Sequence, residues 1–271
     1  TVTEGKIVVD DVLKGVKAGA QTLMVQANDG ENYYEFTMPA FVVSESITSF
    51  DRLVELVQIT SATCGKFNEG KYFILGEDIT LAAGTEYNSQ VKPDGTPAYG
   101  YAGAGSGNGF AGTLDGRGHS IIGGKIAAGG LFGSLQSATI KNISFTDVQA
   151  VNEAPISVIT GSMYDSVIEN VTITVEGNVN VKGWNDGTES VGIISSNRVV
   201  NITLKNVTVK ALGCSFETVF GKGYGNVTAT ITCTDVVINV KALDYITTNS
   251  NNENTLAVGA VQGITVNLTQ E

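Results

Sequence analysis

One pattern occurs four times in this chain, as ATIKNISF at 138–145, SVIENVTI at 166–173, ITLKNVTV at 202–209 and ITCTDVVI at 231–238. Each stretch alternates apolar and polar residues on both sides of one short polar residue, which is Asn142, Asn170, Asn206 or Asp235. These four positions are 28, 36 and 29 residues apart. Self-similarity at a period of roughly 20–50 residues marks a solenoid or another repeat array.

The repeated unit excludes two kinds of array. Its apolar residues follow no helical period, which excludes the helical repeats. A propeller blade needs roughly 40–45 residues and four strands, so this unit is too short for one. We therefore expect an all-β fold, a right-handed parallel β-helix in which each coil of short strands stacks on the coil below through main-chain hydrogen bonds.

The segment 1–45 precedes the repeats and reads as a small module of β-strands. Alternating runs on either side of Asn28, Asp29 and Gly30 predict a β-hairpin, because a type I′ turn needs positive φ at its two central residues. The stretch VDDVLKGVKAG at 9–19 resembles the second half of a bacterial Ig-like module.

The segment 46–271 is expected to hold the β-helix, with two additions. Thr48 or Ser49 can cap a short helix whose apolar face falls at i, i+3, i+4 and i+7, on Phe50, Leu53, Val54 and Val57. Such a helix would cover the otherwise open N-terminal end of the coil stack. Residues 82–109 are rich in Gly, Ala, Tyr and Asn, and we expect a long inserted loop there.

Composition narrows the choice of partners. Hydrophobic residues make up 42% of the chain, enough for a substantial core, and the net charge is −11. This charge would repel nucleic acid and anionic membrane surfaces. No run of 18 apolar residues is present, so no membrane span is expected. The chain begins directly on strand-like residues without a signal peptide, and we expect it to be part of a longer protein.

The three cysteines, Cys64, Cys214 and Cys233, are not in a metal-binding spacing. Cys214 and Cys233 could pair in an oxidising compartment, or both could be buried free thiols. With His119 as the only histidine, zinc sites that use two or three histidines are excluded. We expect neither a metal nor another cofactor.

Residues 110–148 carry a resemblance to a known family. The run FAGTLDGRGHSI at 110–121, GLFG at 130–133 and ATIKNI at 138–143 together resemble the GLUG-type repeats of bacterial surface proteins, which belong with the pectin-lyase-like β-helices. Looser repeats extend the likeness to about residue 268. The resemblance implies an extracellular or bacterial cell-surface protein with an adhesive role. It does not imply a reaction, because this fold carries both lyases and inert stalks.

Two sets of residues are candidates for special roles. We interpret Asn142, Asn170, Asn206 and Asp235 as a structural ladder of corner residues, because short polar side chains tolerate left-handed corners and can hydrogen-bond one coil away. The asparagines also lie in N-x-[ST] sequons, but stacked glycans would clash. Exposed aromatic residues suit recognition of sugar or protein, and the candidates for ligand contact are Tyr87, Tyr99, Tyr101 and Trp184. The alternative is that these aromatics anchor loops onto the helix wall.

The sequence offers no convincing catalytic centre. His119 would need a positioned partner to act as a base, and Asp115 is its nearest carboxylate in sequence. Asp147, Asp165 and Glu169 could supply a pair of carboxylates for glycoside hydrolysis, but nothing favours them. We therefore expect a non-catalytic surface module that binds an extracellular protein or carbohydrate. The alternatives are a polysaccharide lyase or hydrolase on the same fold, and a structural stalk.

Overall fold

The structure is a computed structural model of the 271-residue chain. The residues that it describes are 2–3, 6–7, 19–28, 32–57, 65–88, 109–150, 157–177, 180–181, 192–196, 199–221, 231–247, 256–257 and 260–268. Within these ranges, the regular structure is β-strand except for one helix, α1 (Phe50–Val57). The chain folds into the expected right-handed parallel β-helix, preceded by a small N-terminal set of strands.

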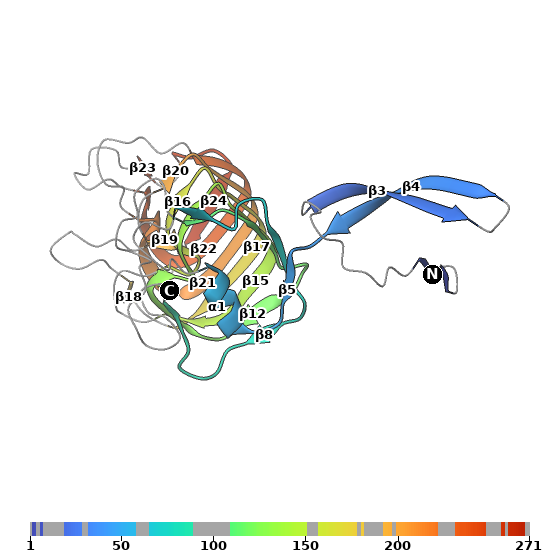
Figure 1. The fold of residues 1–271 in the computed structure, drawn as a ribbon. Coiled ribbons are helices and arrows are strands. Elements are labelled where there is room, and N and C mark those ends of the chain that lie inside the picture. The colour runs from blue at the N-terminus through green and yellow to red at the C-terminus, as the bar shows by residue number, and fades with distance from the viewer. Residues whose placement is uncertain are drawn as a thin grey trace.

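The N-terminal strands form two small antiparallel sheets outside the main sheet. One pairs β1 (Val2–Thr3) with β2 (Lys6–Ile7), and the other pairs β3 (Gly19–Asn28) with β4 (Tyr33–Val42) over ten residues each. The β3–β4 ribbon extends away from the main body (Figure 1). Its register agrees with the predicted hairpin, although the turn at 29–31 lies outside the described residues.

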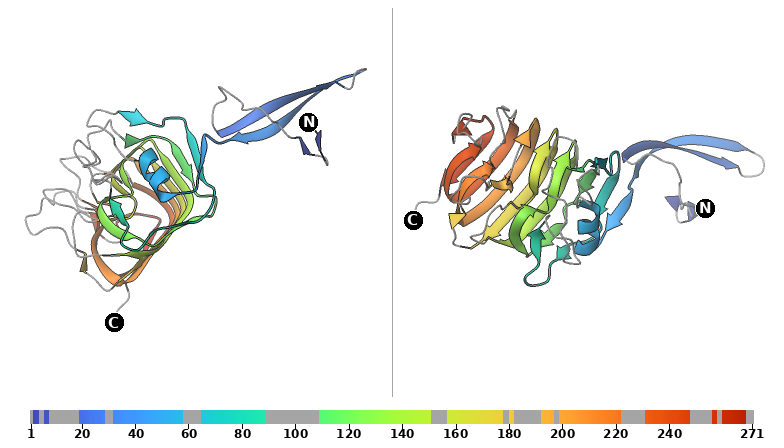
Figure 2. Two further views of the ribbon diagram at one scale, coloured as in Figure 1. Left: turned by 60° about the horizontal axis from the view of Figure 1, so that its bottom comes forward. Right: turned by 60° about the vertical axis from the view of Figure 1, so that its left-hand side comes forward.

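Helix α1 lies at the N-terminal end of the coil stack, as predicted (Figure 2, right). Ser49 caps it: its Oγ accepts a hydrogen bond from the Arg52 backbone N at 3.3 Å. The side chains of Leu53, Val54 and Val57 are buried, and Phe50 is partly buried against the same core. The amphipathic face therefore closes the end of the stack, where the first coil would otherwise have no neighbour.

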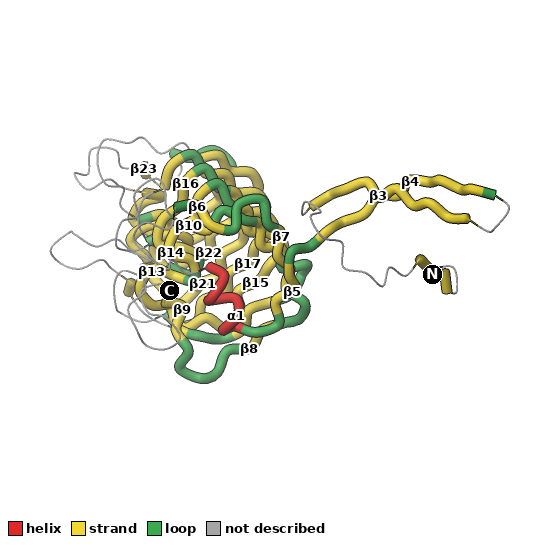
Figure 3. Tube along the Cα trace, viewed as in Figure 1, coloured by secondary structure: helices red, strands yellow, loops and turns green. Residues whose placement is uncertain are grey.

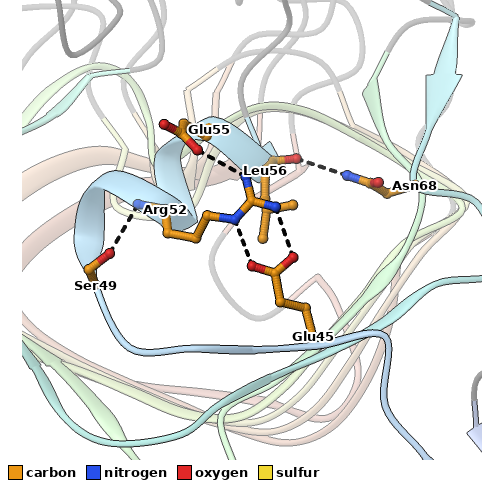
Figure 4. Close-up of polar contacts among 6 residues, drawn as sticks. All are labelled: Glu45, Ser49, Arg52, Glu55, Leu56 and Asn68. Atoms are coloured by element: carbon orange, nitrogen blue, oxygen red, sulfur yellow. Dashed lines mark hydrogen bonds and ion pairs between the residues drawn. The ribbon is translucent and has the colours of Figure 1, made fainter. Parts of the chain in front are cut away.

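Polar contacts fix the helix to the strands around it (Figure 4). The Arg52 guanidinium donates to both carboxylate oxygens of Glu45, with Nε–Oε1 at 2.6 Å and the second bond at 2.8 Å, and it also donates to Glu55 at 2.9 Å. At the other end of α1, Asn68 Nδ2 donates to the Leu56 carbonyl at 3.1 Å. Glu45 lies in β5 (Glu45–Ile47), which pairs in parallel with the first full coil.

The coils stack into one sheet of twenty strands that runs from β5 to β24. Its remaining strands, in chain order, are β6 (Lys66–Phe67), β7 (Tyr72–Leu75), β8 (Ile79–Thr80), β9 (Glu86–Asn88), β10 (Gly109–Phe110), β11 (Thr113–Asp115), β12 (Ser120–Ile122), β13 (Lys125–Gly130), β14 (Phe132–Gln136), β15 (Thr139–Gln149), β16 (Thr160–Tyr164), β17 (Val167–Glu176), β18 (Asn180–Val181), β19 (Gly192–Ser195), β20 (Val199–Val200), β21 (Ile202–Phe220), β22 (Ile231–Thr247), β23 (Leu256–Ala257) and β24 (Ile264–Leu268). The coils lie one beside the next along the stack (Figures 2 and 3), and their pairings are parallel, except that of β22 with β23, which is antiparallel.

The core consists of the inward-facing residues of successive coils. One column runs through Ile140, Ile168 and Leu204, each with 0% of its surface exposed. Near the capped end, the Phe110 ring lies 6.1 Å from the Phe67 ring and 5.5 Å from the Phe132 ring, measured between centroids. Stacking like residues on like residues explains why the sequence repeats at the coil period.

The segment predicted as a loop over 82–109 differs from the expectation at both of its ends. Glu86–Asn88 form β9, which pairs in parallel with β13, and Gly109 begins β10. The Lys125 backbone N also donates to the Thr85 carbonyl at 2.8 Å. The main chain on both sides therefore joins the coil ladder, while residues 89–108 lie outside the described ranges.

Candidate functional site

A column of left-handed residues forms one corner of the β-helix. Asn142, Asn170 and Asn206 have φ angles of 52°, 54° and 48°, and Asp235 has a φ of 54°. Non-glycine residues rarely adopt positive φ, and Asn and Asp tolerate it best. Each of these residues bends its strand at the same point of the coil, so the four corners stack in register.

Side-chain amides join three of these corners into a ladder. Asn170 Nδ2 donates to Asn142 Oδ1 at 2.8 Å, and Asn206 Nδ2 donates to Asn170 Oδ1 at 3.0 Å. Every bond therefore runs in the same direction, toward the N-terminal end of the stack. Asp235 lies opposite Asn206 on the next coil, because Lys205 pairs with Thr234 and Val207 pairs with Val236. Aspartate lacks the N–H donors of an amide, so Asp235 does not continue the ladder with a bond of this kind.

The ladder ends on Asp115 in the preceding coil. Asp115 Oδ1 accepts hydrogen bonds from Asn142 Nδ2 and from the Arg117 backbone N, both at 2.9 Å. Asp115 Oδ2 accepts a hydrogen bond from the Tyr72 hydroxyl and lies 3.7 Å from Lys141 Nζ. An acceptor-only side chain is the natural end of a column of amide donors.

These contacts decide the ionisation of Asp115 and Lys141. Burial alone would raise the pKa of Asp115, but the hydrogen bonds from Tyr72, Asn142 and the Arg117 backbone outweigh it, so the pKa is lowered. The pKa of Lys141 is raised, first by its interaction with the Tyr72 hydroxyl and then by nearby carboxylates. The pKa of Tyr72 is raised by burial and by its bond to Asp115. Asp115 is thus held as a carboxylate.

A tight turn after Asp115 sets Arg117 beside the ladder. A Cβ on Gly116 would lie only 2.5 Å from the Asn142 carbonyl oxygen, so the two coils can approach here only with glycine at this position. Arg117 has a φ of 53° and is exposed. The Gly118 backbone N donates to the Asn142 carbonyl at 2.8 Å, which fixes the turn on the next coil.

An open groove of about 570 Å³ lies along this corner. The residues that line it are Asp115, Arg117, Gly118, Asn142, Ile143, Ser144 and Asn170. Within the described part of the chain, neither the Arg117 guanidinium nor the Ser144 hydroxyl has a hydrogen-bond or ion-pair partner. The groove, which we call the ladder groove, therefore combines amide, guanidinium and hydroxyl groups on an open surface.

His119 does not use Asp115 as its partner. Its Nδ1 lies 3.2 Å from Asp78 Oδ1, an oxygen that also accepts the Ser120 backbone N–H at 2.8 Å. That backbone bond, followed by the contact with His119, lowers the pKa of Asp78. The sequence suggested Asp115 because it is near in the chain, whereas Asp78 comes from the previous coil, 41 residues earlier.

The other carboxylates considered for catalysis lie at separate points of the coil. Asp165 is a corner residue that accepts a bond from Asn201 at 3.1 Å, and Glu169 is 3.7 Å from Lys205. Asp147 occupies a further left-handed position, with a φ of 55°. Of the described residues that line the ladder groove, Asp115 is the only carboxylate.

The predicted aromatic contacts fall largely outside the described residues. Tyr99, Tyr101 and Trp184 lie in undescribed segments, and for Tyr87 only the backbone is described, in β9 opposite Ile126. Sequence reasoning did not identify Arg117 and Ser144 as groove residues. The one signal for Arg117 was its place between two glycines in the DGRG turn, and no sequence signal indicated the contact between Tyr72 and Asp115.

The described cysteines and the sequons have structural surroundings. Cys214 and Cys233 are both free thiols, Cys214 being buried. Burial raises the pKa of Cys233 to about 11.

The Nδ2 atoms of the sequon residues all donate hydrogen bonds to the neighbouring coil; these residues are Asn142, Asn170, Asn201, Asn206 and Asn267. A glycan on any of these nitrogens would remove one of the two donor hydrogens and crowd the adjacent corner.

Comparisons with protein-family models, with curated proteins and with solved structures found no match for this chain. Among the described residues, no three His, Cys, Asp or Glu side chains gather into a possible metal site. The one helix seen there, α1, is too short to cross a membrane.

Proposed function

We propose that this chain is a non-catalytic carbohydrate-binding module of an extracellular or cell-surface protein, with the ladder groove as its ligand site. The observation that carries the proposal is the Arg117 guanidinium, which has no partner among the described residues, beside a column of amides on an open groove. The groove supplies donors and acceptors together, which is what the hydroxyl groups of a sugar require.

The chemistry of the groove favours sugar over an anionic polymer. The guanidinium offers a rigid fork of donors that can bind two neighbouring hydroxyl oxygens at once. The net charge of −11 works against nucleic acid and against densely charged polysaccharides. Around the groove, Arg117 and Lys141 offset Asp115, and Lys205 lies 3.7 Å from Glu169, so a neutral or singly charged sugar meets little repulsion.

The state of Asp115 argues against catalysis at this groove. Glycoside hydrolysis usually needs two carboxylates, one of which is protonated so that it can act as an acid. Asp115 has a lowered pKa, and both of its oxygens are engaged by the protein. Such a carboxylate serves as a fixed acceptor for the ladder and is poorly suited to be a nucleophile or a general acid.

A glycan array followed by calorimetric titration tests the proposal. We expect binding to at least one class of neutral or weakly acidic oligosaccharide. The variant Arg117→Gln, which removes the charge and part of the donor fork, should weaken binding about ten- to a hundredfold. The matched control is Lys210→Gln, which removes one positive charge from β21 outside the groove and should leave binding unchanged.

The two alternatives predict different outcomes. Release of reducing or unsaturated ends from a polysaccharide by the wild-type protein would indicate a hydrolase or lyase and refute the non-catalytic assignment. Absence of binding to any glycan or matrix protein would favour a structural stalk.

A further inference from the structure

Resting on the proposed function, we infer that the ladder groove takes a linear, extended glycan chain that runs along the solenoid axis with about one sugar unit for each coil.

The groove is built from three successive coils. Arg117 and Gly118 follow β11, Asn142 and Ser144 belong to β15, and Asn170 belongs to β17. These strands are direct neighbours: Asp115 pairs with Lys141, and Lys141 pairs with Glu169. The groove therefore runs across the strands, which is the direction of the solenoid axis, and spans about two strand spacings of ~4.8 Å each.

Each rung of the ladder presents the same unused hydrogen-bonding capacity. An asparagine amide has two N–H donors and an oxygen with two lone pairs. Asn142 and Asn170 each use one N–H to donate to the preceding coil and one lone pair to accept from the next coil. One donor and one acceptor are left at each rung, repeated at the coil spacing.

A β-1,4-linked hexose chain in its extended form advances by about one ring for each coil spacing. Neighbouring rings are turned over by about half a turn, so every second ring would present the same edge to an equivalent amide. An extended peptide does not match this repeat, because its residues advance by about 3.3 Å and its side chains return to the same face every ~6.6 Å. The ladder spacing thus favours a glycan over a peptide strand along the same line.

The surface beyond the groove continues the same line in one direction. Ser144 is aligned with Thr172 on β17 and Thr208 on β21, and all three are partly exposed. In the other direction, the turn that carries Arg117 lies at the end of the groove. A bound chain would therefore start against Arg117 and extend toward the C-terminal coils.

Titration with one oligosaccharide series, from the monosaccharide to the hexasaccharide, tests the inference. The series is taken from the sugar that the array identifies. We expect affinity to rise about three- to tenfold with each unit up to three units, since each unit adds about one net hydrogen bond, and to rise less thereafter.

A variant of the third coil tests the assignment of units to rungs. Asn170→Gly removes the amide of the third coil and keeps a residue that accepts positive φ. In this variant the trisaccharide should bind no more tightly than the disaccharide. The matched control is Thr265→Ala, an exposed residue of β24 three coils away, which should leave the whole series unchanged. Circular dichroism confirms that both variants are folded.

The possible failures are distinct. If a monosaccharide binds as tightly as the hexasaccharide, the axial arrangement is wrong and the carbohydrate-binding function stands. If no member of any glycan series binds, both are wrong. If an extended peptide binds in the groove and Arg117→Gln abolishes that binding, the ligand is a protein rather than a glycan, and both proposals are wrong.

Discussion

Replacing Asn170 with alanine should destabilise the β-helix by about 2–5 kcal/mol. Asn170 makes two ladder bonds, of 2.8 and 3.0 Å, and each is worth about 0.5–1.5 kcal/mol net. Alanine must also hold the φ of 54°, which costs about 1–2 kcal/mol for a residue with a Cβ and no local hydrogen bond. The side chain of Asn170 is exposed, so no cavity forms and no further loss is expected.

Two further variants separate the causes. Asn170→Gly loses the same two bonds but adopts positive φ freely, so it should be about 1 kcal/mol more stable than Asn170→Ala. Thr172→Ala, two residues along the same strand and partly exposed, lies outside the ladder and should change stability by about 0.5 kcal/mol or less.

Urea unfolding followed by circular dichroism measures these differences, provided that the dependence on urea concentration has the same slope in each variant. The reasoning is refuted if alanine is as stable as glycine at position 170, because the corner would then carry no backbone strain. It is equally refuted if both variants lie within about 0.5 kcal/mol of wild type.

The remaining predictions concern Asp235, Asp115 and the two described cysteines. Asp235→Asn supplies the amide donor that the last corner lacks, and it should raise the stability to urea by about 0.5–1.5 kcal/mol; an unchanged or lower midpoint would contradict the ladder direction. Because the pKa of Asp115 is lowered on folding, its ionisation stabilises the fold above about pH 4, and this stabilisation is lost as the pH falls through the folded-state pKa. Asp115→Asn should therefore flatten the acid part of the profile of stability against pH. A profile parallel to that of wild type would count against this account. In a Cys64→Ser background, Cys214 and Cys233 should react slowly with an aromatic disulfide reagent at pH 8 in the folded protein and quickly after unfolding. The reason is that Cys214 is buried and that burial raises the pKa of Cys233 to about 11. Fast reaction of the folded protein would refute this.

Much of the fold was predictable from the sequence because a solenoid repeats its own environment. The stacked positions of Asn142, Asn170 and Asn206 followed from the spacing of the repeated pattern, and the register of β15, β17 and β21 agrees with that spacing. The helix cap was predictable for a local reason, since Ser49 and the apolar face of α1 lie within one short segment.

The groove could not be predicted in the same way. Its walls come from three coils, and whether a corner is filled or open depends on how closely neighbouring turns approach. Gly116 permits that approach, while the contact of Tyr72 with Asp115 joins residues 43 positions apart that do not share the repeated pattern. The pairing of His119 with Asp78 has the same origin, because spatial neighbours in a β-helix are one coil apart and the nearest carboxylate in sequence belongs to a different contact.

The sequence by itself determined the repeat, the coil period and the left-handed corners, because these depend on backbone preferences and on alternation along one strand. The tertiary structure alone decided which polar groups are used up between coils and which are left free. Asp115 and the inner amide hydrogens are engaged in the stack, whereas the Arg117 guanidinium and the Ser144 hydroxyl have no partner within the part of the chain that the structure describes. The distinction arises because hydrogen bonds between coils are fixed by three-dimensional register, and it identifies the groups that remain available to a ligand.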